Sequence, residues 1–299
     1  MVGARVSGAV EAALVRFRGG ARFARSTAPF LRDGAIDERA LEALHGALAS
    51  EPDPVAESVA RLVVDVGLAV DPQAWAGGTM IRDRRVIAVL ASGLARPHGP
   101  GRIACLDGLE RNVPGALLGE LEVRLVAELA ARPHATLFLL AAKGKLPSAV
   151  GLVRESAATP RWERDEAAAI ARAAFGDAGA EGEFLRPFTA TTDARQKARF
   201  AAALGKVGSE RAVVALARAL RTPLVIDIPN ALERSVRLDV IQALSHVFPD
   251  VQLFYFPSIT SDESYAAIEA WAEQSFRVTW SEPRPPFLTI AGYPGRRPS

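Results

Sequence analysis

The sequence predicts an all-α protein that is built from stacked antiparallel helix pairs. Two observations carry this prediction. Hydrophobic residues make up 49% of the chain and aromatic residues only 7%, which is typical of Ala- and Leu-rich helices that pack on one another and not of a β-sandwich. A helical segment that ends in Thr-Pro also recurs in the middle of the chain, and such internal repetition is typical of repeat proteins.

The repetition is clearest between two segments that start at Ala149 and Ala212. Their apolar positions coincide, and both segments end in Thr-Pro, at Pro160 and Pro223; two repeats of about 31 residues would give this separation. The later spacing indicates an inserted loop at Pro223–Asn230. Runs of small residues mark the helix before each segment, at Leu140–Gly144, Arg172–Gly176, Ala201–Gly205 and Ile241–Ser245.

One repeat unit has the pattern of a helical hairpin. Asp193 is placed to cap a first helix, and Ser209 is placed to cap a second helix after a turn at Gly205 and Gly208. Pro223 ends the unit, because proline disfavours helix in the residue before it. The small residues before the turn are expected to let the two antiparallel helices approach closely. Since one hairpin cannot bury both of its faces, neighbouring hairpins are expected to stack.

Two segments, Ser235–Leu244 and Arg199–Ala217, resemble HEAT repeats. The first is similar to the first-helix pattern of that family, with Arg237 at its usual basic position; Lys197 holds the equivalent place one repeat earlier. The resemblance extends over about Ala135–Val247. It implies a right-handed α-solenoid in which the second helix of each pair lines the concave face.

The order of periodic segments, loops and proline-rich stretches along the chain predicts three parts. Residues 1–35 are a basic N-terminal extension or a first helix, residues 36–276 are the helical repeat domain, and residues 277–299 are a Pro- and Arg-rich tail that forms an extended strap or a free arm. Helices are predicted at 37–50, 54–68, 80–95, 114–131 and 262–276. The aromatic segment Phe254–Phe256 is expected to cap the stack.

The charge is unevenly distributed although the total is nearly balanced. The chain carries 36 basic and 34 acidic residues, so a protein-wide basic field of the kind that binds nucleic acid is absent. The N-terminal segment, however, is rich in arginine and holds Glu11 as its single acid before Asp33. This composition leaves three alternatives open for the segment, namely an organellar targeting signal, an ordered first helix and a loose basic arm.

The sequence predicts neither an enzyme nor a cofactor or metal site. It lacks the glycine-rich, zinc-protease and nucleophile-elbow motifs of common enzymes, and its histidines are scattered. The lone Cys105 is interpreted as a small core residue. Because a single cysteine cannot form a disulfide within the chain, the sequence suits a reducing compartment. Acidic pairs near predicted helix starts are interpreted as partners of the helix dipoles: Asp165/Glu166, Glu181/Glu183 and Asp262/Glu263.

Five polar positions on or near the second helices are the predicted partner-binding residues. Arginine is enriched at the energetic centres of protein interfaces, although a solvated face is the alternative at each position. The set is Arg154, Glu155, Arg186, Arg218 and Arg221.

The predicted function is a non-enzymatic scaffold or adaptor that binds another protein along the concave face or through its tails. Cytoplasmic residence is the default expectation, and the Ala- and Arg-rich composition suggests a bacterial source. The alternative is binding of nucleic acid or an anionic surface through the basic N-terminal segment. That alternative includes a HEAT-like DNA glycosylase, suggested by Trp162 near Asp165. An accessory subunit similar to the HEAT-containing bilin lyases is a further, remote possibility.

Overall fold

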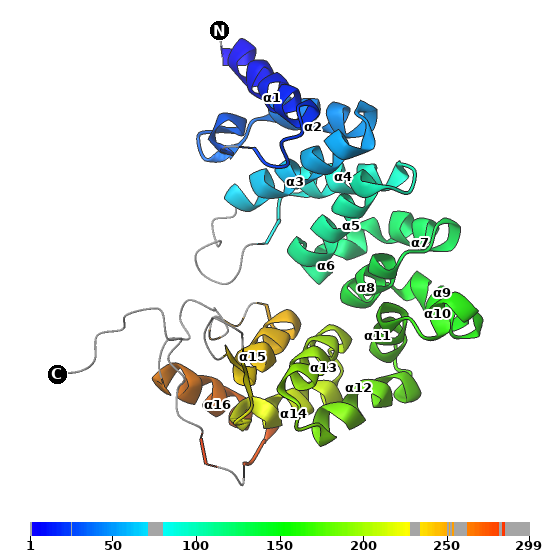
Figure 1. Cartoon of the computed structure of the whole chain (residues 1–299), viewed down its shortest axis with the longest axis vertical. Helices are drawn as coiled ribbons and strands as arrows, with labels where there is room; N and C mark the ends of the chain where they lie inside the picture. Colours follow the sequence, from blue (N-terminus) through cyan, green and yellow to red (C-terminus); the bar gives the residue numbers. More distant parts are fainter. Residues whose placement is uncertain are drawn as a thin grey trace, which may run out of the picture. The chain divides into compact units, whose positions relative to one another are not determined.

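The structure is a computed structural model, which describes residues 2–24, 26–70, 80–227, 234–249, 251, 253, 262–280 and 283–284, without the side chains of residues 2–7. These residues are mostly helical, and their strands form two short two-stranded sheets. The predicted all-α class is therefore confirmed (Figure 1). The chain divides into two compact units, residues 1–152 and 153–299, and the predicted domain 36–276 extends over both.

The first unit consists of helix pairs after an N-terminal helix. The helix α3 packs closely on α5, α5 packs on α8, and α2 contacts both α3 and α4. The two strands pair antiparallel, with Leu31 opposite Ile36. The elements are α1 (Val2–Arg18), η1 (Ala28–Phe30), β1 (Leu31–Arg32), β2 (Ala35–Ile36), α2 (Glu38–Ser50), α3 (Asp53–Ala69), α4 (Arg84–Ser92), η2 (Gly93–Ala95), α5 (Pro100–Asn112), α6 (Gly115–Leu118), η3 (Gly119–Leu121), α7 (Glu122–Ala131), α8 (Ala135–Gly144) and η4 (Pro147–Ala149), followed by α9 (Val150–Glu155), which crosses the unit boundary.

Side-chain caps explain where these helices begin. The Asp37 carboxylate accepts from the backbone N–H groups of Arg39 and Ala40, so α2 starts where the sequence predicts a helix. Asp83 caps α4 in the same way and delays its start relative to the predicted range 80–95. The predicted helix 114–131 is wrong in its continuity, because a 3-10 turn that begins at Gly119 separates α6 from α7. Glycine has a low helix propensity, which favours such a break.

The basic N-terminal segment contains a packed helix. Val10, Leu14 and Phe17 of α1 are buried, and α1 contacts α2 and α3. Arg18 forms ion pairs with Glu11 and with Glu51, which lies just beyond the end of α2. Arg16 and Arg18 therefore belong to an ordered helix and not to a loose chain.

The second unit is also built of packed helices. The helix α13 packs closely on α15, and it also contacts α11, α12 and α14. The predicted inserted loop forms a short antiparallel pair in which Val225 lies opposite Ser235, while residues 228–233 and the aromatic segment Phe254–Phe256 lie outside the described residues. The elements are η5 (Ser156–Ala158), α10 (Pro160–Glu163), α11 (Glu166–Ala174), α12 (Ala178–Ala190), α13 (Ala194–Val207), α14 (Glu210–Arg218), η6 (Ala219–Arg221), β3 (Val225–Ile226), β4 (Arg234–Ser235), α15 (Val236–Val247) and α16 (Asp262–Phe276).

The predicted hairpin after Asp193 is confirmed in its caps. The Asp193 carboxylate accepts from the backbone of Gln196, and the Ser209 hydroxyl accepts from the backbone of Ala212. Gly208 closes α13 with a φ of 61°, a left-handed conformation that glycine adopts without strain.

The close helix approach that was predicted inside this hairpin occurs instead between α13 and α15. A Cβ atom added at Gly205 would lie 2.7 Å from the carbonyl oxygen of Ala243 on α15, so the small residue lets α13 approach α15 and not its partner α14. The reason is that α13 shares its most extensive contact with α15.

Buried arginines close the C-terminal ends of several helices. Arg102 is 1% exposed and donates from Nε to the carbonyl oxygen of Leu94 at 3.2 Å. In the second unit, Arg172 donates to the carbonyl of Trp162 at 3.3 Å, and Arg237 donates to that of Leu220 at 3.0 Å. The last carbonyls of a helix lack partners within the helix and carry partial negative charge, so a guanidinium is well suited to them.

We expect Arg102→Met to lower the free energy of unfolding of the first unit by about 2–3 kcal/mol, because Arg102 also pairs with Glu128 and a broken buried pair is costly. The control is Arg84→Met, which removes an exposed pair with Glu120 and should cost less than about 1 kcal/mol. Urea unfolding followed by circular dichroism measures both. Equal losses in the two variants would contradict a special role of the buried arginine.

Gly205→Ala should destabilise the second unit by about 1–3 kcal/mol, since the new methyl group meets the backbone of Ala243. The matched control is Gly151→Ala in α9, where the added Cβ meets nothing within 4 Å. There the higher helix propensity of alanine should be neutral or stabilising by up to about 1 kcal/mol. Thermal unfolding of both variants checks the sign, and a stabilised Gly205→Ala variant would refute the close approach.

Candidate functional site

An open groove separates α12 from α14 in the second unit. It consists of two adjoining cavities of about 430 and about 420 Å³, and Thr189 lines both of them. We call this feature the α12–α14 groove. The first cavity is lined by Ala178, Gly182, Leu185, Arg186, Thr189 and Arg211; the second is lined by residues 188–192, Lys197, Ala215, Arg218, Ala219 and residues 222–224.

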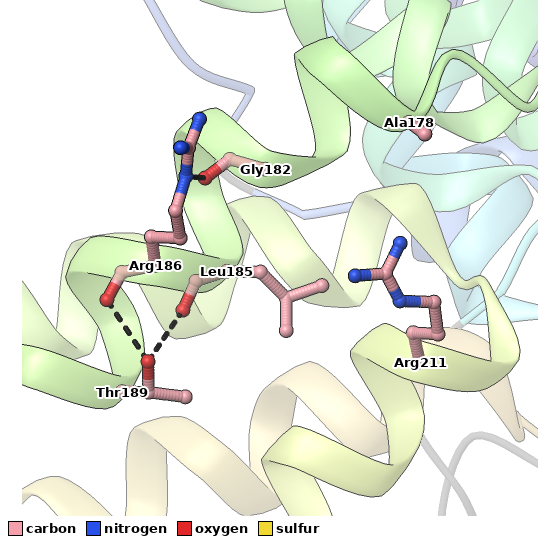
Figure 2. Close-up of a pocket in the computed structure, with 6 residues that line it drawn as sticks. All are labelled: Ala178, Gly182, Leu185, Arg186, Thr189 and Arg211. Carbon is pink, nitrogen blue, oxygen red and sulfur yellow. Dashed lines mark hydrogen bonds between the residues drawn. The ribbon is translucent and has the colours of Figure 1, made fainter.

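The helical spacing of α12 places its lining residues on one face. Ala178, Gly182, Leu185 and Thr189 follow at steps of three and four residues, which is the spacing of neighbours on a helix surface. The small side chain of Ala178 and the absence of one at Gly182 leave room beside the helix. Figure 2 shows Leu185 from α12 and Arg211 from α14 pointing into the space between the two helices.

The groove is positively charged. Its lining contains Arg186, Arg211, Lys197 and Arg218, and among the described residues no aspartate or glutamate lines either cavity. Arg186 and Arg218 are exposed, and in the described part of the chain no carboxylate lies within ion-pair distance of either. Nε of Arg186 donates only to the Gly182 carbonyl of its own helix, at 3.3 Å (Figure 2). These two guanidinium groups therefore remain available to an anionic partner.

Glu181 links the two helices that border the groove. Its side chain is buried, accepts a hydrogen bond from the Ser209 hydroxyl and pairs with Arg211 at 3.0 Å. Because Ser209 also caps α14, this carboxylate fixes the start of α14 against α12. The interpretation of Glu181 as a dipole partner of its own helix is thus incomplete, since its hydrogen bonds go to the next hairpin.

The C-terminal segment lies against the end of α14. Nε1 of Trp280 donates to the carbonyl oxygen of Arg218 at 3.1 Å, and the Arg221 guanidinium lies 4.5 Å from the centre of the Trp280 ring. Arg221 and Arg284 both donate to the same oxygen of the buried Glu269, at 3.0 and 2.9 Å. The described part of the predicted tail is therefore packed as a strap beside the second cavity.

The predicted partner-binding residues have different positions. Arg186 and Arg218 line the α12–α14 groove. Arg221 faces Glu269 and Trp280, so its guanidinium holds the strap. Arg154 and Glu155 are exposed on α9 and do not line the groove.

Arg211 and Lys197 line the groove but were not among the predicted partner-binding residues. Arg211, Ala215 and Arg218 are four and then three residues apart, which places them on one face of α14. This spacing was a usable signal for Arg211. No comparable signal exists for Lys197, because it lies on a different helix, α13.

Trp162, Asp165 and His134, which could have belonged to a catalytic site, are buried or cap helices. Trp162 is 7% exposed, and the Asp165 carboxylate caps α11 by accepting from the backbone of Ala168. This pair therefore does not present an open nucleobase site. His134 caps α8 through Nδ1, and its ring lies 5.8 Å from that of His98.

Within the described ranges, no three His, Cys, Asp or Glu side chains are grouped as metal ligands. Among the helices described, none has the length and apolar character that crossing a bilayer requires.

A comparison with known protein families finds no family that matches the chain, and a search of curated proteins finds no relative.

Cys105 is fully buried and packs beside Gly93, which confirms its interpretation as a core residue. Burial raises the pKa of its thiol from 9.0 to about 12. We expect the native protein at about pH 8 to resist a thiol reagent that modifies it rapidly in urea. Absorbance after addition of a disulfide reagent measures this, and rapid stoichiometric labelling without urea would contradict it.

The same shift predicts the pH dependence of stability. Because the folded pKa lies above the unfolded value, the contribution of the neutral thiol is complete below pH 9.0 and is lost as the pH rises toward about 12. A Cys105→Ser variant should lack this alkaline component, although its buried hydroxyl lowers stability at every pH.

Proposed function

We propose that this protein is a non-enzymatic scaffold that binds another protein at the α12–α14 groove. The supporting observation is the groove itself, an open channel between two helices in which the charged lining residues, among those that the structure describes, are all basic. Arg186 and Arg218 are exposed there, and arginine combines bidentate hydrogen bonding with a wide, weakly hydrated surface that suits protein recognition.

We also propose that the scaffold is a HEAT-like α-solenoid. Support comes from the recurrence of helix pairs and from the contacts of α13 with both α11 and α15, as expected for successive repeats. Arg237, at the basic position of the HEAT-like pattern, donates to the end of the preceding helical segment at Leu220, and Arg172 donates similarly to Trp162. A cytoplasmic location belongs to the same proposal, because a fold with one buried thiol needs no oxidising compartment.

Binding of nucleic acid or an anionic surface through residues 1–35 has less support. The helix α1 is packed on α2 and α3, and Arg18 is already paired with Glu51. Deleting the segment would also expose the apolar residues that Val10, Leu14 and Phe17 cover, so loss of binding after deletion would be ambiguous. Substitution of exposed arginines is the sharper test.

The test is capture of partners from a nuclease-treated native extract by the tagged full-length chain, with washes at low and high salt. We expect a stoichiometric protein that is retained after nuclease treatment and is lost from the Arg186→Glu/Arg218→Glu variant. Both side chains are exposed and unpaired in the described structure, so this variant should fold normally, which circular dichroism checks.

The control variant is Arg22→Gln/Arg32→Gln, which removes two exposed charges from the N-terminal segment. It should retain the partner. Recovery that disappears with nuclease treatment, or that depends on Arg22 and Arg32 but not on the groove, would refute the proposal in favour of nucleic-acid or anionic-surface binding.

A further inference from the structure

We propose that the occupant of the α12–α14 groove is an acidic segment of a partner protein, with an apolar side chain between its carboxylates. This inference rests on the proposed function and specifies the chemistry of the partner. It is argued from the length of the groove, the placement of its cations and the nature of its floor.

The length of the groove fits a short peptide segment. Its lining extends along α12 from Ala178 to Thr192 just beyond the helix end, which at the rise of an α-helix corresponds to about 21 Å. An extended chain covers this distance in about six residues. The site is therefore suited to a linear segment and not to a folded domain surface.

The cations are distributed over both cavities of the groove. Arg186 and Arg211 line the first cavity, and Lys197 and Arg218 line the second. Arg211 is paired with Glu181, whereas Arg186 and Arg218 are exposed and have no carboxylate within ion-pair distance in the described part of the chain. One carboxylate of the partner in each cavity would therefore meet a guanidinium, which can bind it bidentately.

The floor between the cations is apolar. Leu185 points into the first cavity from α12, and Ala215 and Ala219 line the second cavity from the side of α14. The Thr189 hydroxyl between the cavities donates to backbone carbonyls of its own helix, at 3.0 Å to Leu185 and 2.9 Å to Arg186 (Figure 2). An apolar side chain of the partner is therefore the best match for the centre of the groove.

Among the described residues that line the groove, none is an exposed aromatic side chain that would favour a nucleic-acid strand. Proteins that bind single strands stack the bases on exposed aromatic side chains. Phe188 is the aromatic residue of the lining, and it is only 1% exposed, with the Lys197 ammonium 5.0 Å from its ring centre. The positive charge and the apolar floor together favour an acidic peptide over a phosphate backbone.

The experiment measures fluorescence anisotropy of a labelled peptide of about ten residues, long enough for the groove, in which glutamate and leucine alternate. The full chain is the titrant. Matched peptides carry glutamine or lysine in place of glutamate, and an oligothymidylate of similar length is a fourth probe. We expect the chain to bind the acidic peptide, with the glutamine and lysine peptides at least about tenfold weaker.

The groove variant Arg186→Glu/Arg218→Glu should weaken binding of the acidic peptide by about tenfold or more. The matched control is Arg124→Glu/Arg164→Glu, which changes the net charge equally at exposed positions outside the groove. This control should stay within about twofold of the parent chain at constant ionic strength.

Three outcomes would overturn the inference. They are no binding of the acidic peptide, equal weakening by both double variants, and tighter groove-dependent binding of oligothymidylate. If the acidic peptide fails while a protein is still captured after nuclease treatment in a manner that depends on Arg186 and Arg218, the scaffold function stands and only the acidic occupant is refuted.

Discussion

The fold depends on buried arginine side chains that hold the C-terminal ends of its short helices. A short helix leaves a large share of its carbonyl groups without partners, and turns such as η2 and η6 follow directly after them. Arg102 and Arg237 satisfy carbonyls in these turns from the next helix, at Leu94 and Leu220. One guanidinium thus both caps a helix and attaches it to its successor, so the stacking of neighbouring elements is coupled to their termination.

The groove exists because α12 and α14 are held together through other elements. Both helices contact α13, whereas their direct contact is slight. The carboxylate of Glu181 joins them near the start of α14, where it meets Ser209 and Arg211, and the strap packs beside the other end through Trp280. Beside these contacts lie the two cavities of the groove, one lined by Arg186 of α12 and the other by Arg218 of α14.

Much of the local structure could be predicted from the sequence. Asp193 and Ser209 cap the helices they were expected to cap, because a cap depends on residues only two or three positions apart. The role of Gly205 was harder to predict, since Ala243, which it contacts in space, is distant in the sequence. Arg221 was predicted as an exposed binding residue, yet it is engaged by Glu269 from α16, a pairing that no local pattern indicates.

The sequence by itself determined the helical class, the caps at Asp193 and Ser209 and the periodic faces of the helices, because these follow from backbone propensities and from the 3.6-residue period. Only the tertiary structure decided which of the surface arginines line the groove. Arg186 lines its first cavity and Arg218 its second, whereas Arg154 lines neither. The physical reason is that a groove is defined by the separation of two non-consecutive helices, which depends on how each packs against a third.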